Sequence, residues 1–191
     1  MRELDRRGFI LGGCVAALVP CDAFSQIRRI PTVDEIRSRD EKLWRLVDDI
    51  NAYRRTMRLA PIPLSPKLTA VAAKHVKDLA DNAPHKTHGS LHSWSESPLW
   101  KGGPFRASDP KTHALMWDKP REIAGYESEG FEIAASGIRD ASHALDLWKT
   151  SGLHHDVIIN RGIWKDFQWK ALGAVVHKGF ACAWFGTLAD G

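Results

Sequence analysis

Histidines are the residues best suited to chemistry in this chain, and they are unevenly distributed. Of nine in the sequence, three stand within eight residues, at His85, His88 and His92, and two are adjacent, at His154 and His155. Neutral imidazole binds transition metals, and its charge changes near pH 6.5, so such a concentration suits a metal site or a proton-transfer site. The spacing matches neither the helical HExxH motif nor a CxxC zinc motif. Taken alone, each of these histidines is interpreted as a solvated loop residue.

Motifs that the sequence lacks, together with its charge and hydropathy, exclude several classes of function. The sequence contains no GxGxxG, GxxxxGK or GxSxG pattern, so nucleotide binding and common serine hydrolase chemistry have no support. The 27 Lys and Arg are scattered among 23 Asp and Glu, and the net charge is only +4, so we expect no nucleic acid partner. No stretch of about 18 apolar residues occurs, so we expect no transmembrane segment in the mature chain.

The first 25 residues predict an export signal. Basic residues, including the pair Arg6 and Arg7, precede an apolar run over 9–19, and small residues then end at Ser25. The arginine pair resembles a twin-arginine signal, with the general export route as the alternative, and Cys14 ends a short run that imitates a lipoprotein box. Cleavage after Ser25 would send the protein to the periplasm or outside the cell.

Cleavage at that point would also change how many cysteines the mature protein contains. It removes Cys14 and Cys21 and leaves Cys182 alone, so the mature domain has no internal disulfide. Cys182 lies in a segment, 180–185, that is apolar on both alternating faces, which predicts a strand buried on both sides. We therefore interpret Cys182 as a small core residue.

The elements that must position these side chains follow one another as helices first and strands last. After a lead segment, 26–39, a single domain is expected over 40–191. Ser65 and Pro66 form a helix start signal, and His75 falls on the edge of the buried stripe of that helix. The predicted elements are a helix over 40–58, an extended link at 61–63, a helix over 66–82, a long irregular stretch over 85–110, a helix over 140–149, and a hairpin of strands 169–176 and 180–185. This order predicts an α+β domain with helices packed on an antiparallel sheet.

The order of short motifs resembles the CAP superfamily, which comprises cysteine-rich secretory proteins, antigen 5 and plant pathogenesis-related 1 proteins. The likeness covers roughly 42–186. It rests on five motifs in order, namely Asn51-Ala52-Tyr53-Arg54, Leu91-His92-Ser93-Trp94-Ser95, Glu132-Ile133-Ala134-Ala135-Ser136-Gly137, the set Trp148, Ser151, His154 and Ile158, and the closing Leu172-Gly173 with Trp184-Phe185-Gly186. The resemblance implies an α-β-α sandwich, with helices on both sides of a small antiparallel sheet.

Carried over position by position, the resemblance makes His92, Glu132 and His154 the site. Two imidazoles and a carboxylate suit Zn²⁺ or another divalent metal ion, with positions left open for water. The family's second Glu, soon after the Trp that matches Trp148, is missing here. Carboxylates that could replace it, without ranking, are Glu96, Glu129, Asp146 and Asp156.

Three hypotheses for function follow. The favoured one is an exported binding module whose His/Glu cleft holds a divalent ion, a small lipid, or an envelope or protein ligand. The second is a metal-dependent hydrolase or peptidase in which His92, Glu132 and His154 are catalytic, and the missing Glu argues against it. The third is a cleft whose polar residues only hydrogen-bond one another. Four tryptophans, namely Trp94, Trp100, Trp117 and Trp164, are expected either to pack in the core or to line a ligand groove.

Overall fold

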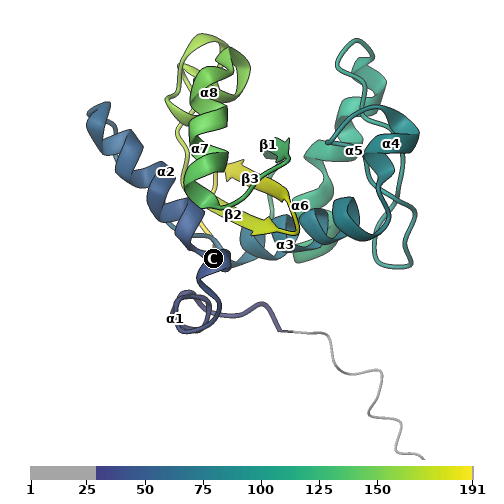
Figure 1. The fold of residues 1–191 in the computed structure, drawn as a ribbon, viewed down its shortest axis with the longest axis horizontal. Coiled ribbons are helices and arrows are strands. Elements are labelled where there is room, and N and C mark those ends of the chain that lie inside the picture. The colour runs from purple at the N-terminus through teal and green to yellow at the C-terminus, as the bar shows by residue number, and fades with distance from the viewer. Residues whose placement is uncertain (1–28, 191) are drawn as a thin grey trace, which may run out of the picture.

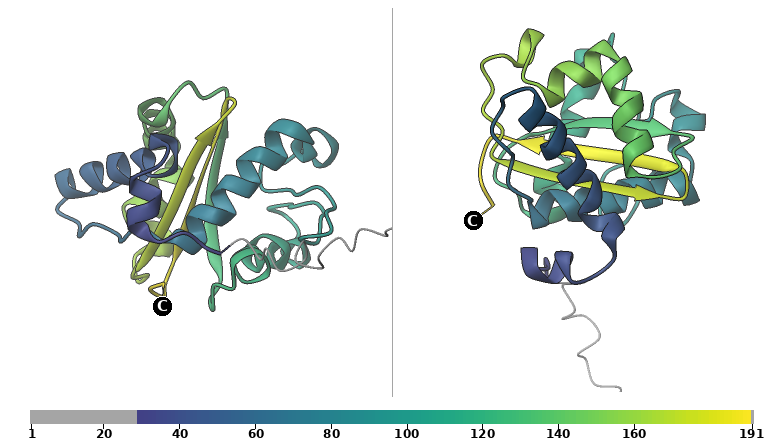
Figure 2. Two further views of the ribbon diagram at one scale, coloured as in Figure 1. Left: turned by 90° about the horizontal axis from the view of Figure 1, so that it is seen from below. Right: turned by 60° about the vertical axis from the view of Figure 1, so that its left-hand side comes forward.

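Three antiparallel strands form the centre of the molecule, in the spatial order β1-β3-β2. The computed structural model describes residues 29–190, so the predicted export signal lies outside the described residues. The strands are β1 (Gly130–Ser136), β2 (Ala171–His177) and β3 (Phe180–Gly186). Helices cover both faces of this sheet (Figures 1 and 2), which confirms the predicted α-β-α sandwich.

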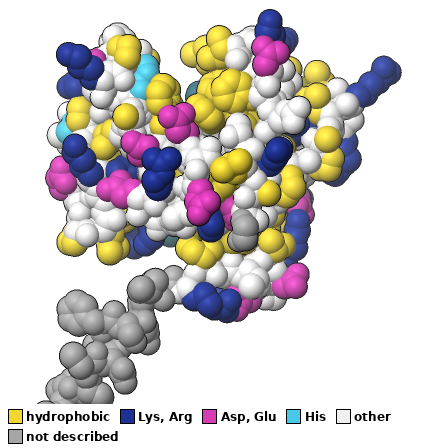
Figure 3. Space-filling view, turned by 180° about the vertical axis from the view of Figure 1, so that it is seen from behind, with side chains coloured by type: hydrophobic (Ala, Val, Ile, Leu, Met, Phe, Trp, Pro, Cys, Tyr) yellow, Lys and Arg dark blue, Asp and Glu magenta, His cyan; other side chains and the backbone are white. Residues whose placement is uncertain are grey.

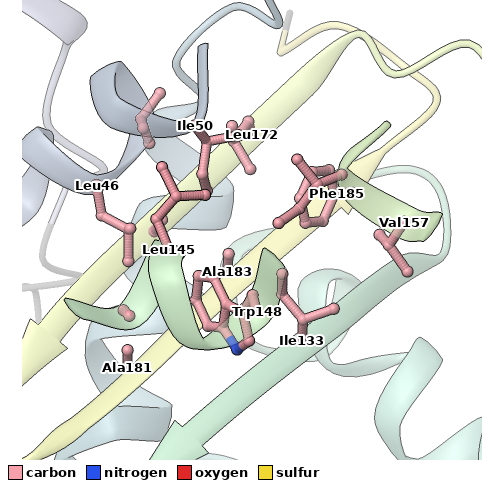
Figure 4. Packing of buried hydrophobic residues seen from close by; sticks show 14 of the residues in the cluster. Leu46, Ile50, Ile133, Leu145, Trp148, Val157, Leu172, Ala181, Ala183 and Phe185 are labelled. Carbon is pink, nitrogen blue, oxygen red and sulfur yellow. The ribbon is translucent and has the colours of Figure 1, made fainter. Parts of the chain in front are cut away.

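One face of the sheet packs against α2 (Arg45–Thr56), α7 (Ala141–Thr150) and α8 (Gly152–Ile158). Alternate strand residues point to this side, so Ala181, Ala183 and Phe185 of β3 join the same apolar cluster. Figure 4 shows Trp148 of α7 close to these strand residues. Trp148 has no exposed surface, and its ring fills the space where α7 crosses the sheet.

The opposite face is covered by α3 (Pro66–Asp81), with α5 (His113–Trp117) and α6 (Lys119–Ala124) beside it. The hydroxyl of Ser65 accepts a hydrogen bond from the backbone N–H of Leu68 at 2.9 Å, so the helix begins where the sequence predicts. Cys182 and Trp184 of β3 point to this side. Together with the residues on the first face, they confirm that β3 is buried on both sides.

Several boundaries differ from the prediction. The helix expected over 40–58 is divided by Trp44, whose φ of −140° and ψ of −22° are not helical, into a 3-10 turn (Glu41–Leu43) and α2. The expected lead contains α1 (Val33–Arg37), and the irregular stretch begins with α4 (Pro84–His88). The prediction also lacks β1, α5, α6 and α8, and two further 3-10 turns lie at Pro110–Thr112 and Gly162–Trp164. Within 29–190, none of the helices has the length and apolar character needed to cross a membrane.

Candidate functional site

Glu132 lies near the start of β1 and points into the protein rather than toward solvent. It pairs in register with Trp184 on β3, and its side chain has no exposed surface. Because side chains alternate along a strand, Glu132 and Ala134 face the α3 side of the sheet, whereas Ile133 and Ala135 face the α7 side. The carboxylate is therefore presented to α3.

His75 of α3 meets this carboxylate from inside the protein. Its Nδ1 contacts Oε1 of Glu132, and its Nε2 lies 3.2 Å from the carbonyl oxygen of Ser93. A carbonyl oxygen only accepts, so Nε2 carries a proton, and the contact between Nδ1 and Oε1 requires a second proton between these two atoms. Burial alone would raise the pKa of Glu132, but the charge of His75 and hydrogen bonds from His75 and His92 outweigh it and lower the pKa to about 2. The site thus contains a buried, hydrogen-bonded pair of a histidine and a glutamate.

His92 meets the other carboxylate oxygen from the outside. Its Nδ1 donates a hydrogen bond to Oε2 of Glu132 at 2.8 Å. The side chain of His92 keeps 20% of its surface exposed, whereas that of Glu132 keeps none. A hydrogen bond from Nδ1 fixes the tautomer, because the neutral ring then has a free lone pair on Nε2. The phenyl ring of Phe105 packs edge-on against the imidazole, with centroids 5.1 Å apart.

Backbone and side-chain hydrogen bonds fix the segment that carries His92. Trp94 and Gly103 exchange backbone hydrogen bonds of 3.1 and 2.9 Å, and the hydroxyl of Ser93 accepts from the N–H of Phe105 at 3.0 Å. One turn after His75, the carboxylate of Asp78 accepts the N–H of Ser95 at 2.9 Å. The long irregular stretch is therefore ordered by α3 and by its own cross-links.

His154 lies on α8 and lines a cleft of about 650 Å³. His88 and His92 also line the cleft, together with Glu132. The pKa of His154 is lowered, first because burial penalises the charged ring and second because His92 repels it, although Glu132 acts in the opposite direction. A lowered pKa keeps this imidazole neutral, which is the form that binds metals.

The cleft also has an apolar rim. Leu153 and Ile163, 83% and 81% exposed, stand at its edge, and Phe105, Met116, Val157 and Trp164 line it further in. Seen from behind, the molecule is hollowed at its upper edge, with hydrophobic side chains beside the hollow (Figure 3). The remainder of that face carries Lys, Arg, Asp and Glu side chains intermixed.

The structure brings the three expected site residues to one cleft but not into one coordination sphere. His92 and Glu132 are hydrogen-bonded, and His154 lines the same cleft. Among residues 29–190, the set of three possible donors that lie within 4.8 Å of one another consists instead of His75, Glu132 and Cys182. The assignment of a metal to His92, Glu132 and His154 stays a prediction.

Candidates for the family's missing second Glu lie elsewhere. Within the described part of the chain, Glu132 is the carboxylate that lines the cleft, and Glu96, Glu129, Asp146 and Asp156 do not. Asp146 pairs with Lys149, and Asp156 pairs with Arg161, each at 2.8 Å. Among residues 29–190, the carboxylate that lines the cleft is thus already hydrogen-bonded to two imidazoles.

The sequence predicts His75 at the edge of the core, and this prediction is wrong. His75 has no exposed surface and contacts Glu132. The one available signal is a titratable residue on an otherwise apolar helix stripe, which implies a buried partner that the sequence does not identify.

The four tryptophans expected either in the core or along a ligand groove are mainly core residues. Trp94 is fully buried, and Trp100 and Trp117 pack against the cluster on the α3 side of the sheet. Trp164 packs against the cluster on the α7 side and also lines the cleft.

Comparison with known proteins agrees with this architecture. A search of curated proteins finds no match. Among solved structures, an extracellular protein with an SCP domain from Bacillus anthracis is 21% identical, with a TM-score of 0.53 over 81% of this chain. This chain spans only 43% of that protein chain. An outer surface protein from Borrelia burgdorferi is 19% identical, with a TM-score of 0.48 over 74% of this chain and 89% of that one. A cysteine-rich secretory protein from Staphylococcus aureus is 13% identical, with a TM-score of 0.49 over 82% of this chain and 41% of that one.

The family model described as "CAP: Cysteine-rich secretory protein family" matches residues 47–183. This range includes the whole sheet apart from the end of β3, and it includes all three expected site residues as well as His75. The chain therefore belongs to the CAP, or cysteine-rich secretory protein, family.

Proposed function

We propose that this protein is an exported binding module whose cleft holds a divalent transition-metal ion between His92 and His154. The observation that carries the proposal is the hydrogen bond from His92 Nδ1 to Glu132 Oε2 at 2.8 Å. A carboxylate that accepts the N–H of a histidine is the usual companion of a metal-ligating imidazole, because it fixes the tautomer and raises the basicity of the other nitrogen.

Glu132 has an orienting role in this proposal, in place of the ligand role expected from the sequence. Each of its oxygens contacts an imidazole and its side chain has no exposed surface, which suits it to orienting His92 rather than to binding an ion in the open cleft. His154 supplies the second nitrogen, and its lowered pKa favours the neutral form that binds metal. Zn²⁺ suits two imidazole nitrogens with positions left for water or a ligand. The residues present fit such an ion.

The apolar rim suggests what would approach the ion. Leu153 and Ile163 are large aliphatic side chains exposed beside the histidines. Exposed aliphatic residues around a polar centre are typical of a ligand site. We infer a ligand with an apolar part and a polar or anionic group, such as a small lipid or an envelope component. The hydrolase alternative has less support, because Glu132, the carboxylate among residues 29–190 that lines the cleft, is already hydrogen-bonded to two imidazoles.

Isothermal titration of Zn²⁺ into untagged protein tests the proposal. We expect His92→Ala and His154→Ala each to weaken binding by about 10-fold or more. His177→Ala removes a histidine that does not line the cleft and serves as the matched control. Cys182→Ser tests the buried donor set and is expected to leave the affinity unchanged. No binding by wild-type protein, or equal binding by all variants, would contradict the proposal.

A further inference from the structure

We propose that His75 is a positioning residue that holds the His92–Glu132 pair in register, because one nitrogen of its ring binds Glu132 and the other binds the backbone carbonyl of Ser93, next to His92. The effect on metal affinity rests on the proposed function, whereas the effect on His92 itself does not.

The two halves of the pair lie on different parts of the chain. Glu132 is on β1, and His92 is in the segment between α4 and the 3-10 turn at Pro110–Thr112. Nδ1 of His75 contacts Glu132, and Nε2 donates to the carbonyl of Ser93, the residue that follows His92. A single imidazole therefore bridges the strand and the loop whose side chains must meet.

The ring that makes this bridge is itself held in place. His75 has no exposed surface and stacks on the indole of Trp94, with centroids 4.0 Å apart and planes 9° apart. On the same helix face, Asp78 binds the N–H of Ser95. The ammonium group of Lys119 lies 5.6 Å from the centroid of the Trp94 ring and also binds the carbonyl of Lys101. These contacts leave the imidazole little freedom to rotate.

The bridge has a consequence for His92. While His75 holds Oε1, Oε2 of Glu132 is aimed at Nδ1 of His92. Without a donor at Oε1, a buried carboxylate oxygen is left without a partner, which favours rotation of the carboxylate toward another donor. Oε2 then no longer faces Nδ1 of His92, so the tautomer of His92 is no longer fixed.

Two substitutions separate the two contacts. The amide nitrogen of Asn occupies the position of Nδ1, so His75→Asn keeps the donor to Glu132 and loses the donor to Ser93. The amide nitrogen of Gln occupies the position of Nε2, so His75→Gln keeps the donor to Ser93 and loses the donor to Glu132. The readout is the pair of ¹⁵N chemical shifts of the His92 ring in metal-free protein, at a temperature where thermal melts show both variants folded.

We expect wild-type protein and His75→Asn to show His92 with the proton on Nδ1, and His75→Gln to show a mixture of tautomers. We expect Zn²⁺ affinity to fall about 10-fold in His75→Gln and less than about 3-fold in His75→Asn. The inference is overturned if the Gln variant, correctly folded, keeps the wild-type His92 shifts, or if the Asn and Gln variants behave alike. If wild-type protein binds no Zn²⁺, the proposed function fails, but the shifts still decide the role of His75.

Discussion

Glu132 and His92 form a hydrogen bond of 2.8 Å across the boundary between the protein interior and the cleft. The side chain of Glu132 has no exposed surface, and that of His92 is 20% exposed. A buried charge on one side of the bond therefore acts on an imidazole that solvent and ligands can reach. His75, which contacts the other oxygen of Glu132 from the interior, is thus connected through this carboxylate to the cleft residue His92.

The low pKa of Glu132 predicts a pH-dependent stability. With a pKa of about 2 in the folded protein and 4.5 as the ordinary value, Glu132 stabilises the fold fully above pH 4.5, and this contribution is lost as the pH falls toward 2. Between pH 5 and pH 3 it should account for about 2 kcal/mol of the free energy of unfolding. Urea denaturation at both pH values measures it, and Glu132→Gln should lose about 2 kcal/mol less over this interval than wild-type protein does. Equal losses in the two proteins would show that Glu132 does not titrate as described.

Asn51 of α2 is expected to be important for stability. Its side-chain amide donates to the carbonyl of Ile62 and accepts the N–H of Ile62, each at 2.8 Å, so it holds the link between α2 and α3. Asn51→Ala leaves two buried backbone groups without partners and should cost about 3 kcal/mol. Thermal and chemical denaturation measure this, with Asn82→Ala, at an exposed helix end, as the control expected to cost about 1 kcal/mol or less. Similar costs for the two variants would contradict the role of Asn51.

Gly173 allows α3 to approach β2 closely. A Cβ atom at this position would overlap the backbone of Leu68 and Thr69, and neither backbone can move without displacing the helix that carries His75. Gly173→Ala should therefore destabilise the protein by more than about 3 kcal/mol or prevent folding. Gly152→Ala is the control, because a Cβ there meets no atom within 4 Å. Soluble expression shows whether the variant folds, and its melting temperature measures the loss of stability. A Gly173→Ala protein as stable as the control would show that α3 and β2 pack less closely than described.

The apolar rim predicts binding of an amphipathic probe. The double variant Leu153→Ser and Ile163→Ser changes only exposed side chains, so its stability should stay within about 0.5 kcal/mol of wild type. Its affinity for the fluorescent anion 1-anilinonaphthalene-8-sulfonate should fall at least about 5-fold. Leu99→Ser, at a residue that is 63% exposed but outside the cleft, is the control and should bind like wild type. If the control loses as much binding as the double variant, the rim is not the binding surface.

The sequence predicted the elements whose own residues contain a clear helix start, an apolar stripe or a turn. α3 has a Ser–Pro start and a regular apolar stripe, and the strands of the β2–β3 hairpin flank a turn at Lys178 and Gly179. In contrast, β1 and α8 were missed. β1 is stabilised by pairing with β3, about 50 residues later, and α8 has only seven residues and no side-chain cap. The stability of both comes from tertiary packing, which local patterns do not record.

In the candidate site, too, the sequence led to some of the residues and not to others. The resemblance to the CAP family led to His92, Glu132 and His154, and these line one cleft. It did not lead to His75, because that contact joins residues 57 positions apart and depends on the side of the sheet that Glu132 faces. The side is set by the register of β1 against β3, which only the folded sheet reveals.

In the proposed function, His92 and His154 together hold a divalent metal ion while Glu132 orients His92. Crystals of the protein soaked in Zn²⁺, with anomalous diffraction measured at the zinc edge, test it most directly. We predict one strong peak in the cleft, about 2.0 to 2.1 Å from a nitrogen of each of these histidines, with the Glu132–His92 hydrogen bond intact. A peak within about 2.3 Å of Cys182 Sγ, or no peak in the cleft, would contradict the account.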